Sequence, residues 1–541
     1  MILEILFLMI MVVLYFFKTR KSLHMMQQNL YNENNRYLKW VKSNKNYFIN
    51  VELIVLFLAA VGFFVAYDFN NYFVVAVLLI TCFYLLEIFL WNKRNKEEQQ
   101  KKPLVVTARV KRLIVTMSIL YLIPIILLFT CSDTDIKRIW LFIFIITAMM
   151  YLNMFITLIA VLINMPIEKI VVYQYYFNKA KTKLKNMKHI KVIGVAGSYG
   201  KTTSKNILSD VLNIKYNALP TPRNLNTPYG LMITINNHLD KFTEVFIAEM
   251  GAYKRGEVAD LVKFVKPKYG ILTNLGTDHL DSYGSEENIK IGNFELVEGL
   301  PLDGLAVLNG DDPKQLSYVE EQLKNKVPLK WIGINNKDVD IRAENIKVSH
   351  QGVTFDVIFK DDKKKYKFET KLLGSHNVYN ILAAIALGIE MDIDMKDLQK
   401  AVSLVKPVQH RLELKKLGNF WQIDDAYNSN PVGAKSACEV LGMMPGIKVV
   451  VTPGMIELAD REHELNKEFG KQIAEVADYA VLIGEKRTRP IMEGLKEAGF
   501  NDKNIIVYND VKKAYDFING LTGKKDVYAL FENDLPDTYN E

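Results

Sequence analysis

Long apolar runs dominate the first third of the chain, and short apolar runs dominate the rest. The long runs are separated by polar segments and lie at 2–17, 49–67, 72–91, 113–131 and 139–165. Four of them have about 19 residues or more, enough for a helix to cross a bilayer core of about 30 Å. This pattern predicts an α-helical membrane region over residues 1–166 with five transmembrane helices.

The charged residues between these runs predict an orientation. Segments 18–48 and 92–112 contain seven and eight Lys and Arg against one and two acidic residues, whereas 68–71 has no basic residue. Basic loops stay cytoplasmic. We therefore expect a multi-pass cell-membrane protein of bacterial type that contacts membrane lipids and keeps its later domains in the cytoplasm. Residues 167–189 mix aromatic side chains with lysines and are expected to form an amphipathic linker helix.

From residue 190 onward, short apolar strands alternate with amphipathic helices. Residues 190–406 contain strand signals at 192–196, 245–250, 269–275 and 305–309, and alternating residues over 338–372 predict an antiparallel patch. A second strand–helix series covers 407–541. This alternation is typical of two α/β domains with largely parallel sheets.

The charge balance follows the same division. The chain of 541 residues has a net charge of +8, but residues 1–189 contain 23 Lys and Arg against 10 Asp and Glu, and residues 190–541 contain 45 against 50. Because the positive charge accompanies the apolar runs, it does not indicate a nucleic-acid partner. Three cysteines without a Cys/His cluster argue against a disulfide framework or a zinc site.

The sharpest local signal is the segment VIGVAGSYGKTT at 192–203. An apolar strand leads into glycines, a lysine and two threonines at the start of a helix, where backbone N–H groups and the helix N-terminus bind phosphate. Lys201 can reach the β- and γ-phosphates, and Thr202 can ligate Mg²⁺. The sequence predicts that ATP and Mg²⁺ are bound here by Gly197, Ser198, Gly200, Lys201, Thr202 and Thr203.

The glycine spacing resembles that of one family. A general P-loop has glycine six residues before its lysine, where this chain has Val195. With its double threonine, the loop is similar to the ATP-binding loop of the Mur ligases, which build the peptide of cell-wall precursors. Further segments over 190–541 resemble that family in the same order. The segment 452–470 is most similar to the branch that adds D-alanyl-D-alanine.

The resemblance implies roles for residues outside the loop. Glu249 stands in the place of a carboxylate ligand of a second Mg²⁺, and His279 would be the second protein ligand of that ion. Asn309, Asn377 and Asn380 would contact adenine, and the C-terminal domain would bring Arg411 and Asp425 to the nucleotide. The implied catalytic residues are Lys201, Glu249, His279, Arg411 and Asp425, and the implied metal ligands are Thr202, Glu249 and His279.

The resemblance also implies a fold and a reaction. Residues 190–406 would form a P-loop ATPase-like central domain and residues 407–541 a Rossmann-like C-terminal domain. ATP would phosphorylate a carboxylate of a cell-envelope precursor, and the amine of an amino acid or dipeptide would attack the acyl phosphate. Lys201 and two Mg²⁺ ions would neutralise the transferring phosphoryl group.

Departures from the family pattern concern the substrate and the metal. The apolar region stands where the family usually has an N-terminal domain for the UDP of a sugar nucleotide, so we expect a lipid-linked acceptor. Asn293 stands where many members have a carbamoylated lysine that helps to bind metal, and Lys290 is three residues away. The segment 530–539 is acidic where the D-alanyl-D-alanine branch is typically basic.

Three alternatives stay open from the sequence. The first is the ordinary reaction of the D-alanyl-D-alanine branch on a UDP-linked muramoyl tripeptide, with the apolar region as a simple anchor. The second is a ligase of the poly-γ-glutamate type, which uses the same ATP fold. The third, from a different class, is a membrane transporter or sensor whose P-loop domain powers or gates the apolar helices.

Overall fold

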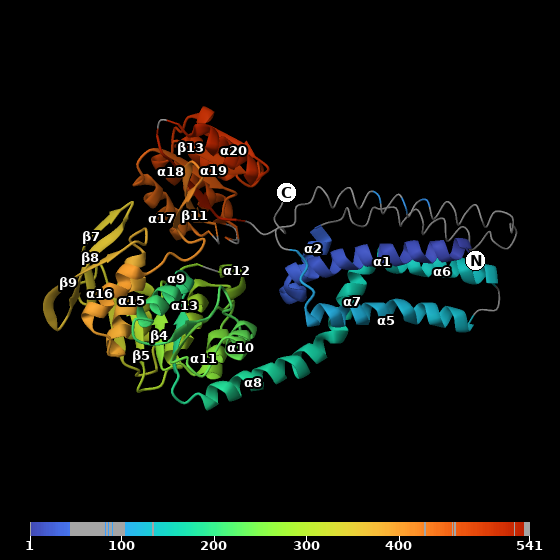
Figure 1. The fold of residues 1–541 in the computed structure, drawn as a ribbon, viewed down its shortest axis with the longest axis horizontal. Coiled ribbons are helices and arrows are strands. Elements are labelled where there is room, and N and C mark those ends of the chain that lie inside the picture. Colours follow the sequence, from blue (N-terminus) through green and yellow to red (C-terminus); the bar gives the residue numbers. More distant parts are fainter. Residues whose placement is uncertain are drawn as a thin grey trace. The chain divides into compact units, whose positions relative to one another are not determined.

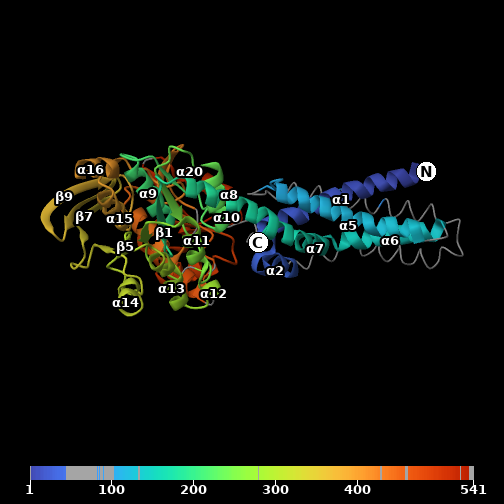
Figure 2. The same cartoon turned by 90° about the horizontal axis from the view of Figure 1, so that it is seen from below.

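The computed structural model describes residues 2–43, 82, 85, 89, 103–131, 135–277, 279–426, 429–456, 458, 461–523 and 525–534. These residues form two compact units, one extending to Tyr175 and the other covering 176–535. Figures 1 and 2 show the helices of the first unit in blue to teal and the mixed α/β structure of the second in green to red.

The first unit is largely helical, and residues 103–107 precede its helix α5 without regular structure. Its elements are α1 (Ile2–Gln28), a 3₁₀ turn (Leu30–Asn35), α2 (Arg36–Ser43), α5 (Ala108–Cys131), α6 (Asp135–Tyr151) and α7 (Asn153–Pro166), which a π-helical turn (Ile167–Val172) connects to α8 (Tyr173–Asn186). Helices α1, α2, α5 and α7 share an apolar core that includes Leu23, Tyr37 and Met117. Polar side chains are buried beside it, since Asn153 Nδ2 donates to Ser22 Oγ at 2.7 Å.

The prediction of a multi-pass membrane protein is contradicted. Among the described residues, one helix, Asn153–Asn186, is long and apolar enough to cross a membrane. The run 49–67 lies outside the described residues, as does the run 72–91 except for residues 82, 85 and 89. Part of the apolar surface packs internally, because apolar side chains of α1, α5 and α7 contact one another in a shared core. The predicted cytoplasmic orientation and the predicted contact with membrane lipids were inferred from the same five apolar runs, so they lose their support with the multi-pass prediction.

The second unit begins with a nine-stranded sheet in the order β2-β3-β1-β4-β5-β6-β7-β8-β9. The parallel strands are β2 (Ala218–Pro220), β3 (Val245–Glu249), β1 (Lys191–Ala196), β4 (Tyr269–Leu272), β5 (Leu305–Asn309) and β6 (Leu329–Gly333). The last three, β7 (Ile341–Ser349), β8 (Gly352–Phe359) and β9 (Asp362–Thr370), pair antiparallel with one another. This confirms the predicted parallel strands and the antiparallel patch.

Helices cover both faces of this sheet (Figure 1). On one face α9 (Lys201–Leu212), α15 (Asn377–Glu390) and α16 (Met395–Leu404) share a core with the strands. On the other face α11 (Glu257–Val265) and α13 (Glu286–Glu298) contact each other and β1. Three further helices, α10 (Pro228–Asn237), α12 (Leu280–Tyr283) and α14 (Pro313–Glu321), lie in the connections. The central strand β1 therefore ends between its neighbours β3 and β4, where parallel α/β sheets place ligands.

The C-terminal domain has a six-stranded sheet in the order β10-β11-β15-β12-β13-β14. Its strands are β10 (Glu413–Leu417), β11 (Phe420–Asp425), β12 (Ile447–Thr452), β13 (Tyr479–Ile483), β14 (Ile505–Tyr508) and β15 (Val527–Glu532). Helices α17 (Pro431–Gly442), α18 (Glu462–Val476) and α19 (Arg489–Glu497) pack on one face, and α20 (Val511–Leu521) packs on the other. Both domains are thus of α/β type, as the alternation of strands and helices predicted.

Candidate active site

The loop between β1 and α9 has the backbone conformation of a phosphate-binding loop. Gly197 and Gly200 have positive φ angles of 133° and 86°, and a Cβ on Gly197 would lie 2.1 Å from Thr273 Oγ1. Only glycine is compatible with both constraints. The loop leads directly into α9, whose first N–H groups are therefore available to bind an anion.

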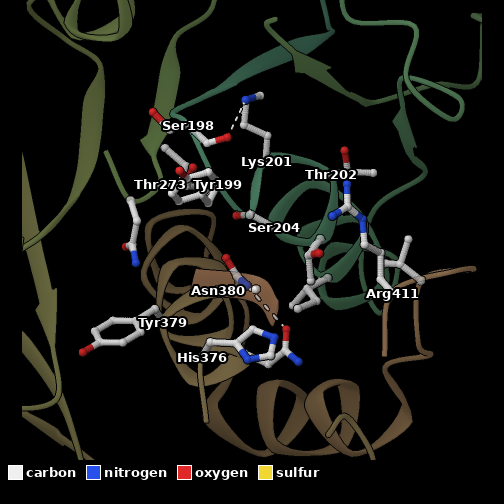
Figure 3. A pocket seen from close by; sticks show the side chains of 18 of the residues that line it. Ser198, Tyr199, Lys201, Thr202, Ser204, Thr273, His376, Tyr379, Asn380 and Arg411 are labelled. Carbon is white, nitrogen blue, oxygen red and sulfur yellow. Dashed lines mark hydrogen bonds between the residues drawn. The ribbon is translucent and has the colours of Figure 1, made fainter. Parts of the chain in front are cut away.

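The polar side chains of this loop are suited to an anionic ligand. Lys201 Nζ donates to the carbonyl oxygens of Gly197 at 2.5 Å and Ser198 at 2.9 Å, so its ammonium is folded back over its own loop. Among the described residues, the buried hydroxyls of Ser198 and Ser204 have no hydrogen-bond partner. Figure 3 shows these groups around one cavity. Because buried hydroxyls are normally paired, the loop fits the phosphates of ATP.

Glu249, at the end of β3, is the most heavily engaged carboxylate of the pocket. It is 1% exposed. Its Oε1 accepts hydrogen bonds from Thr202 Oγ1 and Asn226 Nδ2, both at 3.0 Å. Its Oε2 lies 2.8 Å from Lys205 Nζ, in a charge pair whose angles are not those of a hydrogen bond. The predicted metal ligands Thr202 and Glu249 are therefore adjacent.

His279 lies at the same pocket on a strained turn. Its φ angle is +57°, in the left-handed region, immediately before α12. Its ring contacts that of Tyr253, with centroids 4.4 Å apart, and both residues line the pocket with Glu249. Within the described part of the chain, no group of three or more His, Cys, Asp or Glu side chains is arranged to hold a metal ion.

The three predicted adenine contacts also line the pocket, and all three are buried. Asn309 donates through Nδ2 to Asn274 Oδ1 at 2.8 Å, and Asn377 donates to the Leu373 carbonyl at 2.8 Å. Asn380 lies close to the P-loop, since its Oδ1 would be 3.4 Å from a Cβ on Gly200. Asn309 and Asn377 thus hold local backbone structure, whereas Asn380 is placed beside the loop itself.

The C-terminal domain adds Arg411 and Asp425 to the lining of this pocket. Arg411 lies between two residues in the left-handed region, His410 and Leu412, with φ angles of 60° and 45°. Such strain is often concentrated at functional sites. The Leu412 N–H donates to Asp425 Oδ1 at 3.2 Å, which fastens this turn to the end of β11.

A second carboxyl lies beside Asp425. Strand β15 pairs with β11 in a register that places Glu532 opposite Asp425. Glu532 is 1% exposed, and its Oε1 accepts a hydrogen bond from Ser429 Oγ at 2.6 Å. Burial raises the pKa of Asp425 to about 6, although the nearby Arg411 guanidinium lowers it. Burial also raises the pKa of Glu532 well above its ordinary value, and the charge of Asp425 raises it further. This pair therefore retains a proton that two exposed carboxyls would lose.

Several residues at or beside the pocket were not predicted. Lys205 follows Lys201 by one turn of α9, and this spacing is the only sequence signal for it. His376 joins the domains, because its Nδ1 lies 2.8 Å from Ser436 Oγ, and burial lowers its pKa to about 4. Tyr379 donates to Asp311 at 2.8 Å and lines the pocket. Figure 3 labels His376 and Tyr379 near Asn380.

Asn293, which stands in the place of the carbamoylated lysine, contacts the P-loop directly. It is buried on α13, its Oδ1 accepts from the Gly197 N–H at 2.8 Å, and its Nδ2 donates to the Ile289 carbonyl at 2.8 Å. Lys290 pairs instead with Glu287 at 2.8 Å. Asn293 therefore positions the loop through a neutral amide, and neither residue presents a carboxylate to a metal.

Both domains match models of one protein family. Residues 195–388 match the Mur ligase middle domain, and residues 410–531 match the Mur ligase glutamate ligase domain. The UDP-N-acetylmuramoyl-tripeptide–D-alanyl-D-alanine ligase of Bacillus subtilis is 33% identical over 287 residues, which are 52% of this chain and 60% of that protein. The enzyme of the same name from Escherichia coli is 28% identical over 321 residues, 59% of this chain and 70% of that one. This chain thus spans less than two thirds of the B. subtilis relative.

Solved structures show the same fold. MurF from Acinetobacter baumannii has a TM-score of 0.61 at 24% identity, covering 67% of this chain and 78% of that one. The MurF ligase of Thermotoga maritima, solved in complex with ADP, has a TM-score of 0.57 at 26% identity, covering 66% of this chain and 80% of that one.

Proposed function

Because the chain carries the middle and C-terminal domains of the Mur ligase family, we propose that it is an ATP- and Mg²⁺-dependent amide ligase that joins D-alanyl-D-alanine to the tripeptide of a UDP-N-acetylmuramoyl acceptor. The observation that carries this proposal is the pocket of about 340 Å³, which the P-loop lines together with Arg411 and Asp425 of the C-terminal domain. That volume lies in the range of small-ligand sites.

The lining residues have complementary roles in this reaction. The α9 N-terminus and Lys201 would bind the phosphates, and Arg411 would add a second cation from the other domain. Mg²⁺ supplied with ATP would neutralise charge on the phosphoryl oxygens, and Thr202 is the residue placed to hold it. A guanidinium and an ammonium from different domains both border the cavity, so domain closure would complete the site.

The names of the relatives support the proposed acceptor. The two curated relatives described above are named for a UDP-linked muramoyl tripeptide and for D-alanyl-D-alanine, and this supports the soluble acceptor over the lipid-linked one that the sequence favoured. A transporter or sensor has no use for the C-terminal Arg411 and Asp425 at the nucleotide pocket. We therefore favour the D-alanyl-D-alanine ligase among the alternatives.

The test is a reconstitution with the full chain. Incubation with ATP, Mg²⁺, UDP-N-acetylmuramoyl tripeptide and D-alanyl-D-alanine should yield ADP and the pentapeptide product, measured by mass spectrometry. Lys201→Ala should lower the rate by at least about 100-fold, because phosphate positioning and charge neutralisation are lost. Lys263→Ala, on the exposed face of α11, is the matched control and should keep full activity.

Substrate competition then tests the acceptor and the amine. A mixture of UDP-linked and polyprenyl-linked acceptors should give product on the UDP-linked one, and a mixture of D-alanyl-D-alanine with single amino acids should give the dipeptide adduct. Product only on the lipid-linked acceptor, or addition of a single amino acid, would replace this assignment. ADP release without any amide product would contradict the ligase activity itself.

A further inference from the structure

Lys205 is a fully buried lysine beside the candidate site, where it contacts the lining residue Glu249. Its side chain is 0% exposed, and that of its partner Glu249 is 2% exposed. Its Nζ lies 2.8 Å from Glu249 Oε2 and donates to the Arg223 carbonyl at 2.6 Å. A lysine is almost never fully buried unless it is paired. The chain thus maintains a fixed positive charge beside the P-loop.

The Lys205 ammonium lies next to Glu249, the carboxylate that the family resemblance assigns to a second Mg²⁺. Both oxygens of Glu249 are engaged, one by Thr202 and Asn226 and the other by Lys205. Mg²⁺ coordinates carboxylate oxygens at 2.0–2.1 Å and demands near-octahedral geometry. An ammonium at 2.8 Å from one of those oxygens would repel a divalent ion bound there.

The other residues expected to bind a second Mg²⁺ are also poor ligands for this ion. Asn293 is a neutral amide whose Oδ1 and Nδ2 are bonded to the Gly197 N–H and the Ile289 carbonyl. The His279 ring contacts the Tyr253 ring, with an angle of 50° between the ring planes. Within the described part of the chain, no group of three or more metal-ligating side chains exists here. With the Lys205 ammonium paired to Glu249, the donor set does not fit a second Mg²⁺, whereas Thr202 at the start of α9 does fit the Mg²⁺ that accompanies ATP.

We propose that the Lys205 ammonium takes the place of the second divalent cation. Lys205 is then a positioning residue: it neutralises Glu249, and Glu249 in turn holds Thr202 of the P-loop and Asn226 of the loop that follows β2. Its bond to the Arg223 carbonyl, whose residue has a left-handed φ of 48°, fastens the same loop. The site would therefore use one metal ion, which arrives with the nucleotide. This inference rests on the proposed ATP-dependent function.

The test counts metal ions directly. The full chain is loaded with ADP and titrated with Mn²⁺, and bound Mn²⁺ is measured by electron paramagnetic resonance while bound ADP is measured in parallel. We expect one Mn²⁺ per bound ADP in the wild type. Lys205→Met frees Glu249 and should bind a second Mn²⁺, Lys205→Arg should keep one, and the double variant Lys205→Met/Glu249→Gln should return to one.

Each outcome separates the possibilities. Two Mn²⁺ ions per ADP in the wild type would overturn the inference and leave the ATP site intact, even if the Lys205→Met variant fails to fold. A folded Lys205→Met variant that still binds a single Mn²⁺ would also overturn it. Absence of ADP binding to the wild type would contradict the proposed function instead. The Glu249→Gln background reports whether the extra ion depends on this carboxylate.

Discussion

Glu249 and Asp425 are both buried carboxylates at the ends of β-strands that border the same pocket, yet their surroundings are opposite. Glu249 is compensated by the Lys205 ammonium and by two donated hydrogen bonds. Asp425 lies opposite another carboxyl, Glu532, and burial raises the pKa values of both. The middle domain therefore presents a charge-balanced cluster, and the C-terminal domain presents a strained pair that retains a proton.

This difference shows that a buried carboxylate at the end of a strand can either hold neighbouring loops in place or change its protonation near neutral pH. A carboxylate with a buried counter-ion holds neighbouring loops in place, and its removal leaves that counter-ion uncompensated. A carboxyl beside a like charge destabilises the fold at neutral pH but changes its protonation near pH 6, where an enzyme can use it. The opposite signs of these two effects on stability make the comparison testable.

The largest effect is expected for Glu249→Gln. This variant leaves the Lys205 ammonium buried without its counter-ion, and the free energy of unfolding should fall by about 3–5 kcal/mol. Urea denaturation followed by circular dichroism measures the loss. Adding Lys205→Met should restore most of it, and a double variant that is as unstable as the sum of the two single variants would show that the pair is not coupled.

The Asp425–Glu532 pair should show the opposite sign and a dependence on pH. An acid whose pKa is raised from 3.8 to about 6 in the folded state contributes stability that is present below about pH 4 and lost as the pH rises through about 6. Asp425→Asn removes this loss. The free energy of unfolding of the variant, relative to that of the wild type, should therefore rise by about 2–3 kcal/mol between pH 4 and pH 7.5. An advantage that is constant with pH would contradict the raised pKa.

Glu532→Gln should have a smaller effect in the same direction. It removes one of the two facing carboxyls but keeps a side-chain oxygen that accepts the Ser429 hydroxyl. We expect a gain of about 1–2 kcal/mol at pH 7.5, because the desolvation of a carboxylate is no longer required. Thermal unfolding at this pH measures the gain. Ser429→Ala, which removes a hydrogen bond from the same carboxyl, should lower stability and serves as the contrasting control.

The smallest effect is expected for the neutral amide of Asn293. Asn293→Ala leaves the buried Gly197 N–H without its acceptor, which should cost about 1–2 kcal/mol in the free energy of unfolding. Nucleotide binding should weaken as well, because this N–H belongs to the P-loop. A loss as large as that of Glu249→Gln would show that the charge pairs are not the dominant polar interactions of the site.

The fold of residues 191–532 could be predicted because its signals are local. Each apolar run such as 192–196 or 305–309 is a buried strand, and the alternating residues of 338–372 are the antiparallel strands β7–β9. The predicted site residues converge for the same reason. They follow strands or begin helices at one edge of the sheet, and of those predicted, all except Gly197 line the pocket.

The rest of the site depends on pairings that local patterns do not encode. In the sequence, Lys205 is indistinguishable from other charged residues on a helix, because its partner Glu249 lies on β3 and is adjacent only in the folded structure. Glu532 becomes a partner of Asp425 only through the register of β11 with β15. The long apolar runs of the N-terminal unit were misread, because apolar length alone does not distinguish a membrane span from a helix packed against its neighbours.

The proposed ligase activity requires the formation of an acyl phosphate in this pocket, and an isotope measurement tests this step. The UDP-N-acetylmuramoyl tripeptide is labelled with ¹⁸O in its reacting carboxylate and converted with ATP and D-alanyl-D-alanine. We predict that one ¹⁸O per turnover appears in the inorganic phosphate, because the carboxylate oxygen leaves with the phosphoryl group. Unlabelled phosphate released alongside amide product would contradict carboxylate phosphorylation and the ligase mechanism proposed for this chain.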